Sequence, residues 1–99
     1  MQHLRRRQLN QARYAAQNRH QTLAYLKVHP CVDCGEADPT VLDFDHVRES
    51  KAFNIANAIT RLAWTRIVRE IQKCEVRCAN CHRRKTAREN QWFKARFGA

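Results

Sequence analysis

The amino-acid sequence predicts a small α+β fold, and three observations support this prediction. A chain of 99 residues forms one domain at most and buries only about two thirds of its surface on folding, so its hydrophobic core is small. Two short segments have the alternation expected of strands: VLDFDHV at residues 41–47 and EVRC at residues 75–78. Stretches without Gly or Pro precede, separate and follow these segments, which predicts helices around a small sheet.

The first helix is expected over residues 4–28, and Pro30 ends it. Its apolar stripe is thin and consists of Leu9, Ala12, Ala16, Leu23 and Leu26. We therefore divide the chain into a basic N-terminal helix, residues 1–29, and a folded domain, residues 30–99.

Two further helices are expected on either side of the second strand. Residues 54–74 place apolar side chains at helical spacing, and these are expected in the core: Trp64, Ile67, Val68 and Ile71. From residue 79 onward, one face of the last helix is expected to point inward, formed by Ala79, His82, Thr86, Phe93 and Phe97. Arg84 and Arg88 point to the other side, so His82 is predicted to face the interior.

Four of the five cysteines form two Cys-x-x-Cys pairs, CVDC with Cys31 and Cys34 and CANC with Cys78 and Cys81. Four thiolates complete a tetrahedral zinc site, and pairs from distant parts of the chain would stabilise a domain with a small core. Such a site has no open position, so the zinc is predicted to be structural. A redox site would need only one pair. Cys74 is left over and is expected to be a small buried side chain.

The surroundings of the protein are expected to be reducing and cytoplasmic. No segment near the N-terminus has the apolar core of a secretory signal, so disulfides are not expected. No apolar run approaches the roughly 20 residues needed to cross a bilayer, so no membrane partner is expected. The Arg-rich start also resembles a transit peptide, although it lacks serine.

The formal net charge of +10 predicts a polyanionic partner, and nucleic acid is the natural candidate. The first 28 residues carry basic side chains and no acid, and residues 51–99 are also strongly basic. Only residues 31–50 are acidic on balance. The alternative is a solvated basic face that keeps the protein in solution, and charge alone does not separate DNA from RNA.

The first predicted strand ends in Asp45 and His46, and a second histidine, His82, directly follows Cys81. Zinc binding would fold the strand end back toward the helix that carries His82. Because Asp45 and His46 point to opposite sides of a strand, one of them can share a divalent ion with His82 while the other acts on water. A neutral histidine is a suitable general base near pH 7. The alternative is a strand-end pair that only hydrogen-bonds a turn.

The segments CVDCG, LDFDHV, KAFNI and CEVRCANCHRRKT, in this order, resemble the zinc-containing branch of the HNH endonucleases of phages and bacteria. The resemblance covers residues 31–86 and implies a ββα-metal fold that cleaves DNA. By position it implies that His46 is the general base and that Asp45 and His82 bind one catalytic ion such as Mg²⁺, Mn²⁺, Ni²⁺ or Zn²⁺. The four cysteines match the structural zinc ligands of this branch.

One family residue has no counterpart. Lys73 stands where many members have their middle asparagine, so we assign that role to Asn80, ahead of Asn54 and Asn57. Phosphate contacts are predicted for Arg83, Arg84 and Lys85, and for Arg5, Arg6 and Arg7.

Two other functions compete with the nuclease. One is a non-catalytic, zinc-stapled nucleic-acid-binding module, and the other is a protein-interaction domain. A single ββα-metal unit would nick one strand, so cleavage of both strands would require a homodimer. A phage or bacterial protein partner is a further possibility that the resemblance suggests.

Overall fold

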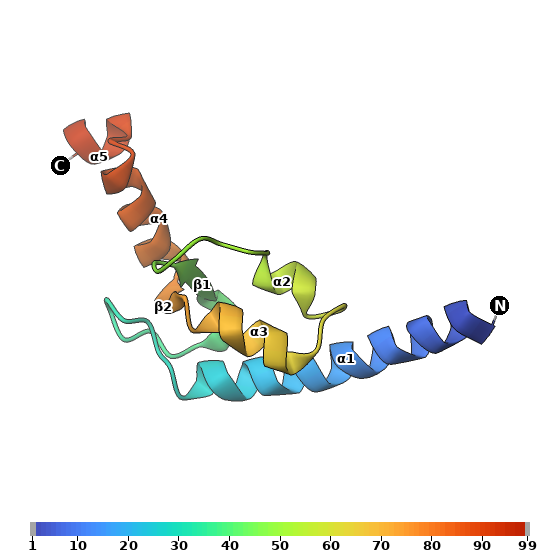
Figure 1. The fold of residues 1–99 in the computed structure, drawn as a ribbon. Coiled ribbons are helices and arrows are strands. Elements are labelled where there is room, and N and C mark those ends of the chain that lie inside the picture. The colour runs from blue at the N-terminus through green and yellow to red at the C-terminus, as the bar shows by residue number, and fades with distance from the viewer. Residues whose placement is uncertain (1, 99) are drawn as a thin grey trace.

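The computed structural model describes the backbone of residues 2–98, and within this range all side chains except those of residues 2–7 and residue 10. The chain forms a two-stranded sheet with helices before, between and after the strands (Figure 1). The elements are α1 (Gln2–Lys27), the 3₁₀ turn η1 (Pro39–Val41), β1 (Leu42–His46), α2 (Ile55–Ala58), α3 (Trp64–Ile71), β2 (Cys74–Cys78), α4 (Ala79–Glu89) and α5 (Phe93–Phe97). The predicted small α+β fold is confirmed.

The strands β1 and β2 are antiparallel, with Leu42 opposite Cys78 and His46 opposite Cys74. Because side chains alternate along a strand, this register separates the two faces of the sheet. Phe44 and Val76 share the apolar face, and His46 lies on this face at the end of β1. Asp45 lies on the opposite, charged face, where a carboxylate and the guanidinium of β2 meet.

Two small clusters of buried side chains make up the core. One joins the end of α1 to the sheet and contains Leu26, Cys31, Leu42, Val76, Cys78 and Cys81. The other lies between α2, α3 and the start of β2 and contains Ile55, Ala58, Ile67, Ile71 and Cys74. Tyr25 and Phe44 pack against both clusters and connect them. Cys74 is buried, as predicted.

The face of α1 that packs against the domain differs from the predicted apolar stripe. Leu26 is buried, but Leu9 is 62% exposed, and Leu23 and both alanines of the stripe are also exposed. The buried positions one and two turns before Leu26 are instead polar, Thr22 and Asn18. The stripe prediction was therefore wrong for most of its length.

Asn18 explains why a polar residue is buried on α1. Its Nδ2 donates to the carbonyl oxygens of Ile59 at 2.9 Å and Leu62 at 2.7 Å. Carbonyl groups just beyond a short helix have no partner inside that helix, and Asn18 supplies one. Its Oδ1 and the hydroxyl of Thr22 have no partner among the described residues. The Asn18 side chain therefore fixes α1 to the segment that follows α2.

The predicted helix at 54–74 is interrupted. Asn54 caps α2 by accepting a hydrogen bond from the backbone N–H of Asn57, and residues 59–63 separate α2 from α3. Ile67 and Ile71 are buried on α3, as predicted, and Trp64 and Val68 are half-buried.

The last predicted helix is also broken, and α5 projects with the end of α4 as an arm away from the body (Figure 1). Gln91 has a positive φ of 52°, the Gln91 N–H donates to Arg88 O, and the Trp92 N–H donates to Ala87 O. This hydrogen-bond pattern is a Schellman motif, which ends a helix. Phe93 and Phe97 are therefore exposed rather than inward-facing.

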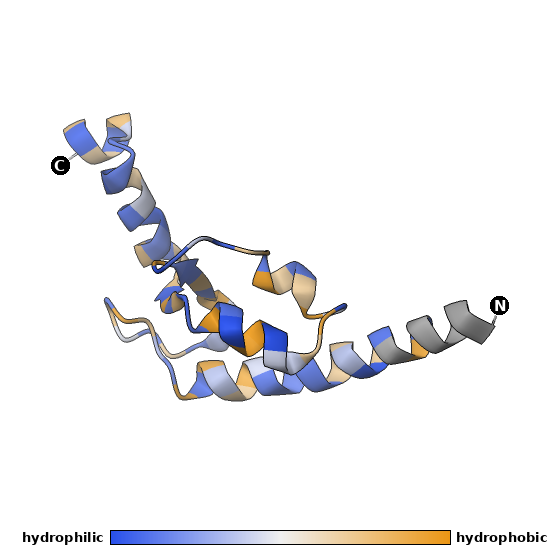
Figure 2. Cartoon of the chain, viewed as in Figure 1, coloured by the Kyte–Doolittle hydropathy of each residue, from blue (hydrophilic) through white to orange (hydrophobic). Residues whose placement is uncertain are grey.

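The molecule is elongated, with principal extents of 59 × 25 × 20 Å, because α1 and the α4–α5 arm both extend beyond the sheet (Figure 1). Hydrophilic colours predominate along the coloured part of α1 (Figure 2). Among the described residues, no helix combines the length and the apolar character that crossing a membrane requires.

Candidate metal centre and active site

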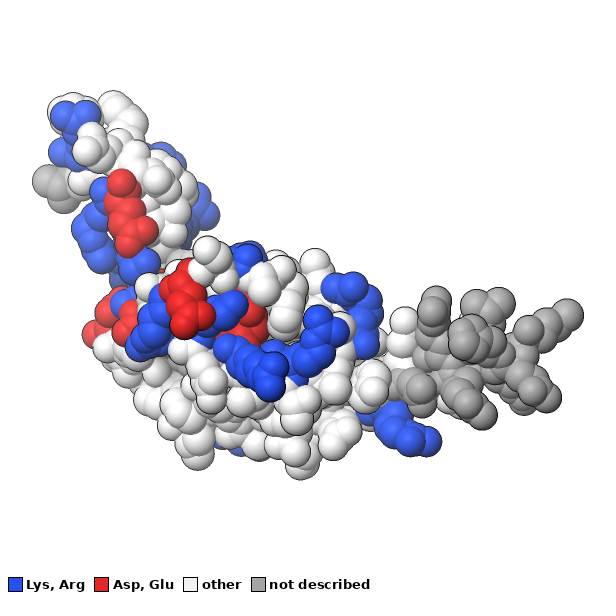
Figure 3. All heavy atoms as spheres, viewed as in Figure 1, with Lys and Arg blue, Asp and Glu red and all other residues white. Residues whose placement is uncertain are grey.

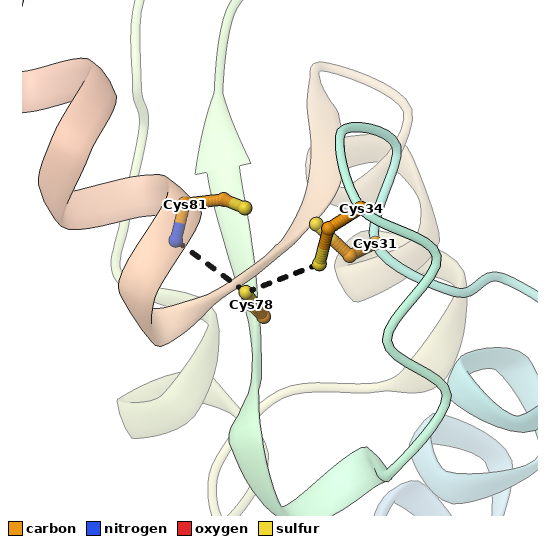
Figure 4. A group of neighbouring side chains, drawn as sticks. All are labelled: Cys31, Cys34, Cys78 and Cys81. Atoms are coloured by element: carbon orange, nitrogen blue, oxygen red, sulfur yellow. Dashed lines mark hydrogen bonds between the residues drawn. The ribbon is translucent and has the colours of Figure 1, made fainter.

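The four cysteines of the two Cys-x-x-Cys pairs meet at one point (Figure 4). One sulfur from each of Cys31, Cys34, Cys78 and Cys81 lies within 4.8 Å of the others, and the Cys34 and Cys78 sulfurs are 3.7 Å apart. A tetrahedral zinc ion with Zn–S bonds of about 2.3 Å separates its sulfur ligands by about 3.8 Å. The cluster therefore fits a zinc ion, and these residues would hold it. Within residues 2–98 all five cysteines are free thiols.

Local backbone structure brings the sulfurs together. Cys31 and Cys34 lie on a turn after α1, in which Gly35 has a φ of 79° and its N–H donates to Cys31 O. A positive φ of this kind favours glycine. Cys78 ends β2, and its sulfur accepts a hydrogen bond from the Cys81 N–H in the first turn of α4. The Val32 N–H donates to Val76 O and fixes the turn against β2.

The thiols influence one another strongly. Burial acts to raise the pKa of Cys31, but hydrogen bonds from backbone groups, that of Cys78 foremost, lower it to about 6. Hydrogen bonding to the Cys78 sulfur and burial together raise the pKa of Cys81 to about 12. Four thiolates so close together repel one another, and a divalent cation among them removes this repulsion.

On the charged face of the sheet, the structure brings Asp45 and His82 together. His82 Nε2 lies 3.5 Å from Asp45 Oδ1, and His82 Nδ1 lies 3.3 Å from Asp43 Oδ2. Neighbouring ligands each about 2.1 Å from one divalent ion are roughly 3.0–3.4 Å apart. The separation of Asp45 from His82 is slightly longer than this range, and binding of a second metal ion by the pair stays a prediction.

The other oxygen of Asp45 is already neutralised by two cations. Arg77 Nη1 lies 2.8 Å and Lys85 Nζ 3.2 Å from Asp45 Oδ2. Arg77 also binds Asp33 at 2.7 Å, which ties the first cysteine turn to the sheet. Lys85, for which a phosphate contact is predicted, thus lies against the carboxylate and Glu89.

His46 points to the other side of β1 and contacts Glu70 on α3, with 3.0 Å between Nε2 and Oε2. Glu70 is 2% exposed and also accepts the Ala52 N–H at 2.9 Å and Lys73 Nζ at 3.0 Å. Burial acts to raise the pKa of Glu70, but these hydrogen bonds lower it to about 2. An ionised carboxylate only accepts hydrogen bonds, so His46 Nε2 carries a proton. In the neutral ring, Nδ1 then has the free lone pair.

His46 and His82 both line one cavity of about 430 Å³. Its lining also includes Asp43, Lys51 and Asn54. Asn54 is a neighbour of the site, but its side-chain oxygen caps α2. The cavity therefore places a candidate general base and a candidate metal ligand around the same space.

Three residues near the site were not predicted from the sequence. Glu70 is an acid one turn after Ile67 on the buried side of α3, and this position was the available signal. Asp43 shares a strand face with Asp45, two residues away. Lys51, which lines the cavity, begins the KAFNI segment of the resemblance, but no role was predicted for it.

The remaining predicted site residues lie elsewhere. Asn80 lines a groove between α4 and α5 together with Arg83 and Arg84, and not the cavity of His46. Its catalytic role stays a prediction, as does phosphate binding by these arginines. The side chains of Arg5, Arg6 and Arg7 lie outside the described residues. Figure 3 shows Lys and Arg side chains spread over the α4–α5 arm and the body, with fewer acids among them.

Comparison of the chain with models of known protein families, with curated proteins and with solved structures found no match.

Proposed function

We propose that this protein is a metal-dependent endonuclease of the HNH type that hydrolyses phosphodiester bonds of DNA. One observation carries the proposal: His82, whose Nε2 lies 3.5 Å from Asp45 Oδ1, lines the same cavity as His46. His82, one of the two groups suited to a divalent ion, thus lines the same cavity as a histidine that can accept a proton. Such a combination is what hydrolysis of a phosphodiester requires.

In this proposal each side chain has one task. His46 accepts a proton at Nδ1 from the attacking water, while Glu70 holds Nε2 and orients the ring. Asp45 and His82 hold a divalent cation such as Mg²⁺, Mn²⁺, Ni²⁺ or Zn²⁺, which when bound supplies Lewis-acid stabilisation of the phosphate. The products would be 5′-phosphate and 3′-hydroxyl ends.

The four-cysteine centre would have a structural part in this function. The zinc ion would join the turn after α1 to the β2–α4 junction, which carries His82 next to Cys81. The net charge of +10 favours a nucleic acid as the partner, the resemblance suggests DNA, and free thiols suit a reducing cytoplasm. One such unit would nick a single strand, and a homodimer or a phage or bacterial partner protein would be needed to cut both.

A second function, a non-catalytic zinc-stapled nucleic-acid-binding module, is favoured by the surroundings of Asp45. Arg77 and Lys85 already neutralise one oxygen of its carboxylate, so Asp45 has a structural use without a divalent ion. In that case the basic surface would bind nucleic acid and leave it intact.

A plasmid-nicking assay with added divalent ion separates the two functions. The zinc-loaded wild type should nick supercoiled DNA, and His46→Ala should slow nicking by roughly 10²–10⁴-fold, the range for a positioned general base. His20→Ala, which removes an exposed histidine of α1, is the matched control and should nick at the wild-type rate. Binding without nicking by the wild type would establish the non-catalytic module, and full activity of His46→Ala would exclude His46 as the base.

A further inference from the structure

A second basic feature lies away from the proposed active site, in the corner between α4 and α5. It is a groove of about 450 Å³. Its polar and aromatic lining consists of Asn80, Arg83, Arg84, Arg88, Trp92 and Lys94. None of the described residues that line it is acidic. Figure 3 shows basic side chains along the arm that carries the groove, together with uncharged surface and an acidic patch.

The groove contains an exposed indole. Trp92 is 41% exposed, and it belongs to neither core cluster. The Schellman motif at Gln91 places it at the bend, as the residue that precedes α5. The guanidinium carbon of Arg83 lies 5.9 Å from its ring centre, within the range of a cation–π contact. A flat aromatic surface is thus held among cations without a role in the core.

We propose that this groove binds an unpaired stretch of a nucleic-acid strand, with one base stacked on Trp92 and its phosphates bound by Arg84, Arg88 and Lys94. Single-strand sites combine these two features: cations that follow the backbone and an aromatic ring that accepts any base. In a duplex the bases are already stacked on one another, so an aromatic platform has no free base face to bind. The cationic lining excludes a basic partner and fits a polyanion.

The groove lies on the same helix as His82, and the role suggested for it in DNA cleavage rests on the proposed function. His82 is in the first half of α4, and Arg83 and Arg84 follow it directly. The groove residues lie on another side of α4 than His82, so a strand that passes around this helix from His82 would reach Trp92. DNA with unpaired nucleotides next to the cleaved bond, such as a flap, bubble or overhang, is the class of substrate that would occupy both places.

Binding of a fluorescently labelled short oligothymidylate tests the groove without any cleavage. The probe is titrated with zinc-loaded full chain in the absence of added divalent ion, and a duplex of equal length is titrated in parallel. Trp92→Ala should weaken oligothymidylate binding by roughly 5- to 100-fold, the loss of one base stack. It should change duplex binding far less.

Two matched controls make the result specific. Phe97→Ala removes another exposed aromatic of α5, and Arg96→Gln removes a cation of α5, and neither residue lines the groove. Both should bind oligothymidylate nearly as the wild type does, whereas Arg88→Gln should bind it more weakly. Bound oligothymidylate should also quench the tryptophan fluorescence of the wild type and not that of Trp92→Phe.

The possible outcomes are distinct. Unchanged binding by Trp92→Ala, or equal weakening for oligothymidylate and duplex, would overturn the single-strand site. His46→Ala should bind oligothymidylate like the wild type. If the wild type does not nick DNA but Trp92→Ala weakens oligothymidylate binding, only the nuclease is refuted. If the wild type nicks DNA but Trp92→Ala binds oligothymidylate as the wild type does, only the groove is refuted.

Discussion

Glu70 Oε2 lies 3.0 Å from Nε2 of His46 and joins the end of β1 to the buried face of α3. The same carboxylate accepts the Ala52 N–H from the loop that follows β1, and it pairs with Lys73 at the end of the α3 segment. Three separate parts of the chain thus meet at one buried acid. The orientation of the His46 ring is therefore set by packing around Glu70, and not by the strand alone.

Glu70→Gln is expected to lower the nicking rate by roughly ten- to a hundredfold with little change in DNA affinity, because the amide no longer fixes the ring as a carboxylate does. The measurement is single-turnover nicking together with DNA binding. In the His46→Ala background, Glu70→Gln should have almost no further effect on the rate, since there is no ring left to orient. Additive losses would show that Glu70 acts only on the stability of the fold.

Glu70 should also make folding stability depend on acid. Its pKa in the folded protein is about 2, below the ordinary value of 4.5, so the folded state favours the ionised form. The resulting stabilisation is present above about pH 4.5 and is lost as the pH falls toward 2, with a size of roughly 3 kcal/mol. Urea unfolding of wild type and Glu70→Gln across this range measures it. The stability difference between them should shrink as the pH falls, and a constant difference would contradict the prediction.

Removal of zinc should unfold the protein. A structural zinc ion contributes roughly 10 kcal/mol or more, which exceeds what two small core clusters can replace. Elemental analysis should find one tightly bound zinc per chain, and circular dichroism should show unfolding when a chelator is added. Cys78→Ser should lose the ion, whereas Cys74→Ala, the fifth cysteine, should keep it. A folded, zinc-free wild type would refute the structural role.

Features that depend on short-range patterns could be predicted from the sequence. The spacing of Cys31 with Cys34 and of Cys78 with Cys81 indicated the cysteine cluster, and alternation indicated both strands. The break at Gln91 could not be predicted, because its Schellman motif is formed without the usual glycine. The packed face of α1 was missed because Asn18 is polar. It is buried where it donates hydrogen bonds to carbonyl groups more than 40 residues away in the sequence.

The residues of the candidate site also differ in whether they could be predicted from the sequence. Asp45, His46 and His82 stood out because each lies at the end of a strand or directly behind a cysteine pair. Glu70 was missed because its contact with His46 spans 24 residues and depends on how α3 packs against β1. A charged side chain inside a predicted apolar stripe is therefore a signal that deserves the same weight as a motif.

Asn18→Ala should lower the free energy of unfolding by roughly 1–3 kcal/mol, because it leaves the carbonyl groups of Ile59 and Leu62 without their donor. Denaturation by urea measures the change. Gln17→Ala, at the exposed neighbouring position of α1, is the matched control and should be nearly neutral. Equal stability of Asn18→Ala and wild type would mean that water replaces the amide at these carbonyls.

Divalent-ion dependence should separate the residues that hold the catalytic ion from the one that accepts a proton. Asp45→Asn is preferred to Asp45→Ala. Alanine would remove the carboxylate that lies 2.8 Å from the buried Arg77, one of its ion-pair partners, and put nothing polar in its place. Asp45→Asn and His82→Ala should each nick slowly at low ion concentration and recover part of the rate at high concentration. His46→Ala should stay slow at every concentration, since no ion replaces a proton acceptor.

Lys85→Ala provides the matched control for this titration. Lys85 Nζ lies 3.2 Å from Asp45 Oδ2, so its removal takes a competing cation away from the carboxylate. The variant should therefore reach half of its maximal nicking rate at a lower ion concentration than the wild type, the opposite of Asp45→Asn. Recovery of His46→Ala at high ion concentration would show that His46 is not the proton acceptor, and identical titrations of all four variants would show that Asp45 and His82 do not share an ion. If the Asp45 carboxylate only neutralises Arg77 and Lys85, then Asp45→Asn and Lys85→Ala should reach half of their maximal nicking rate at the same ion concentration as the wild type.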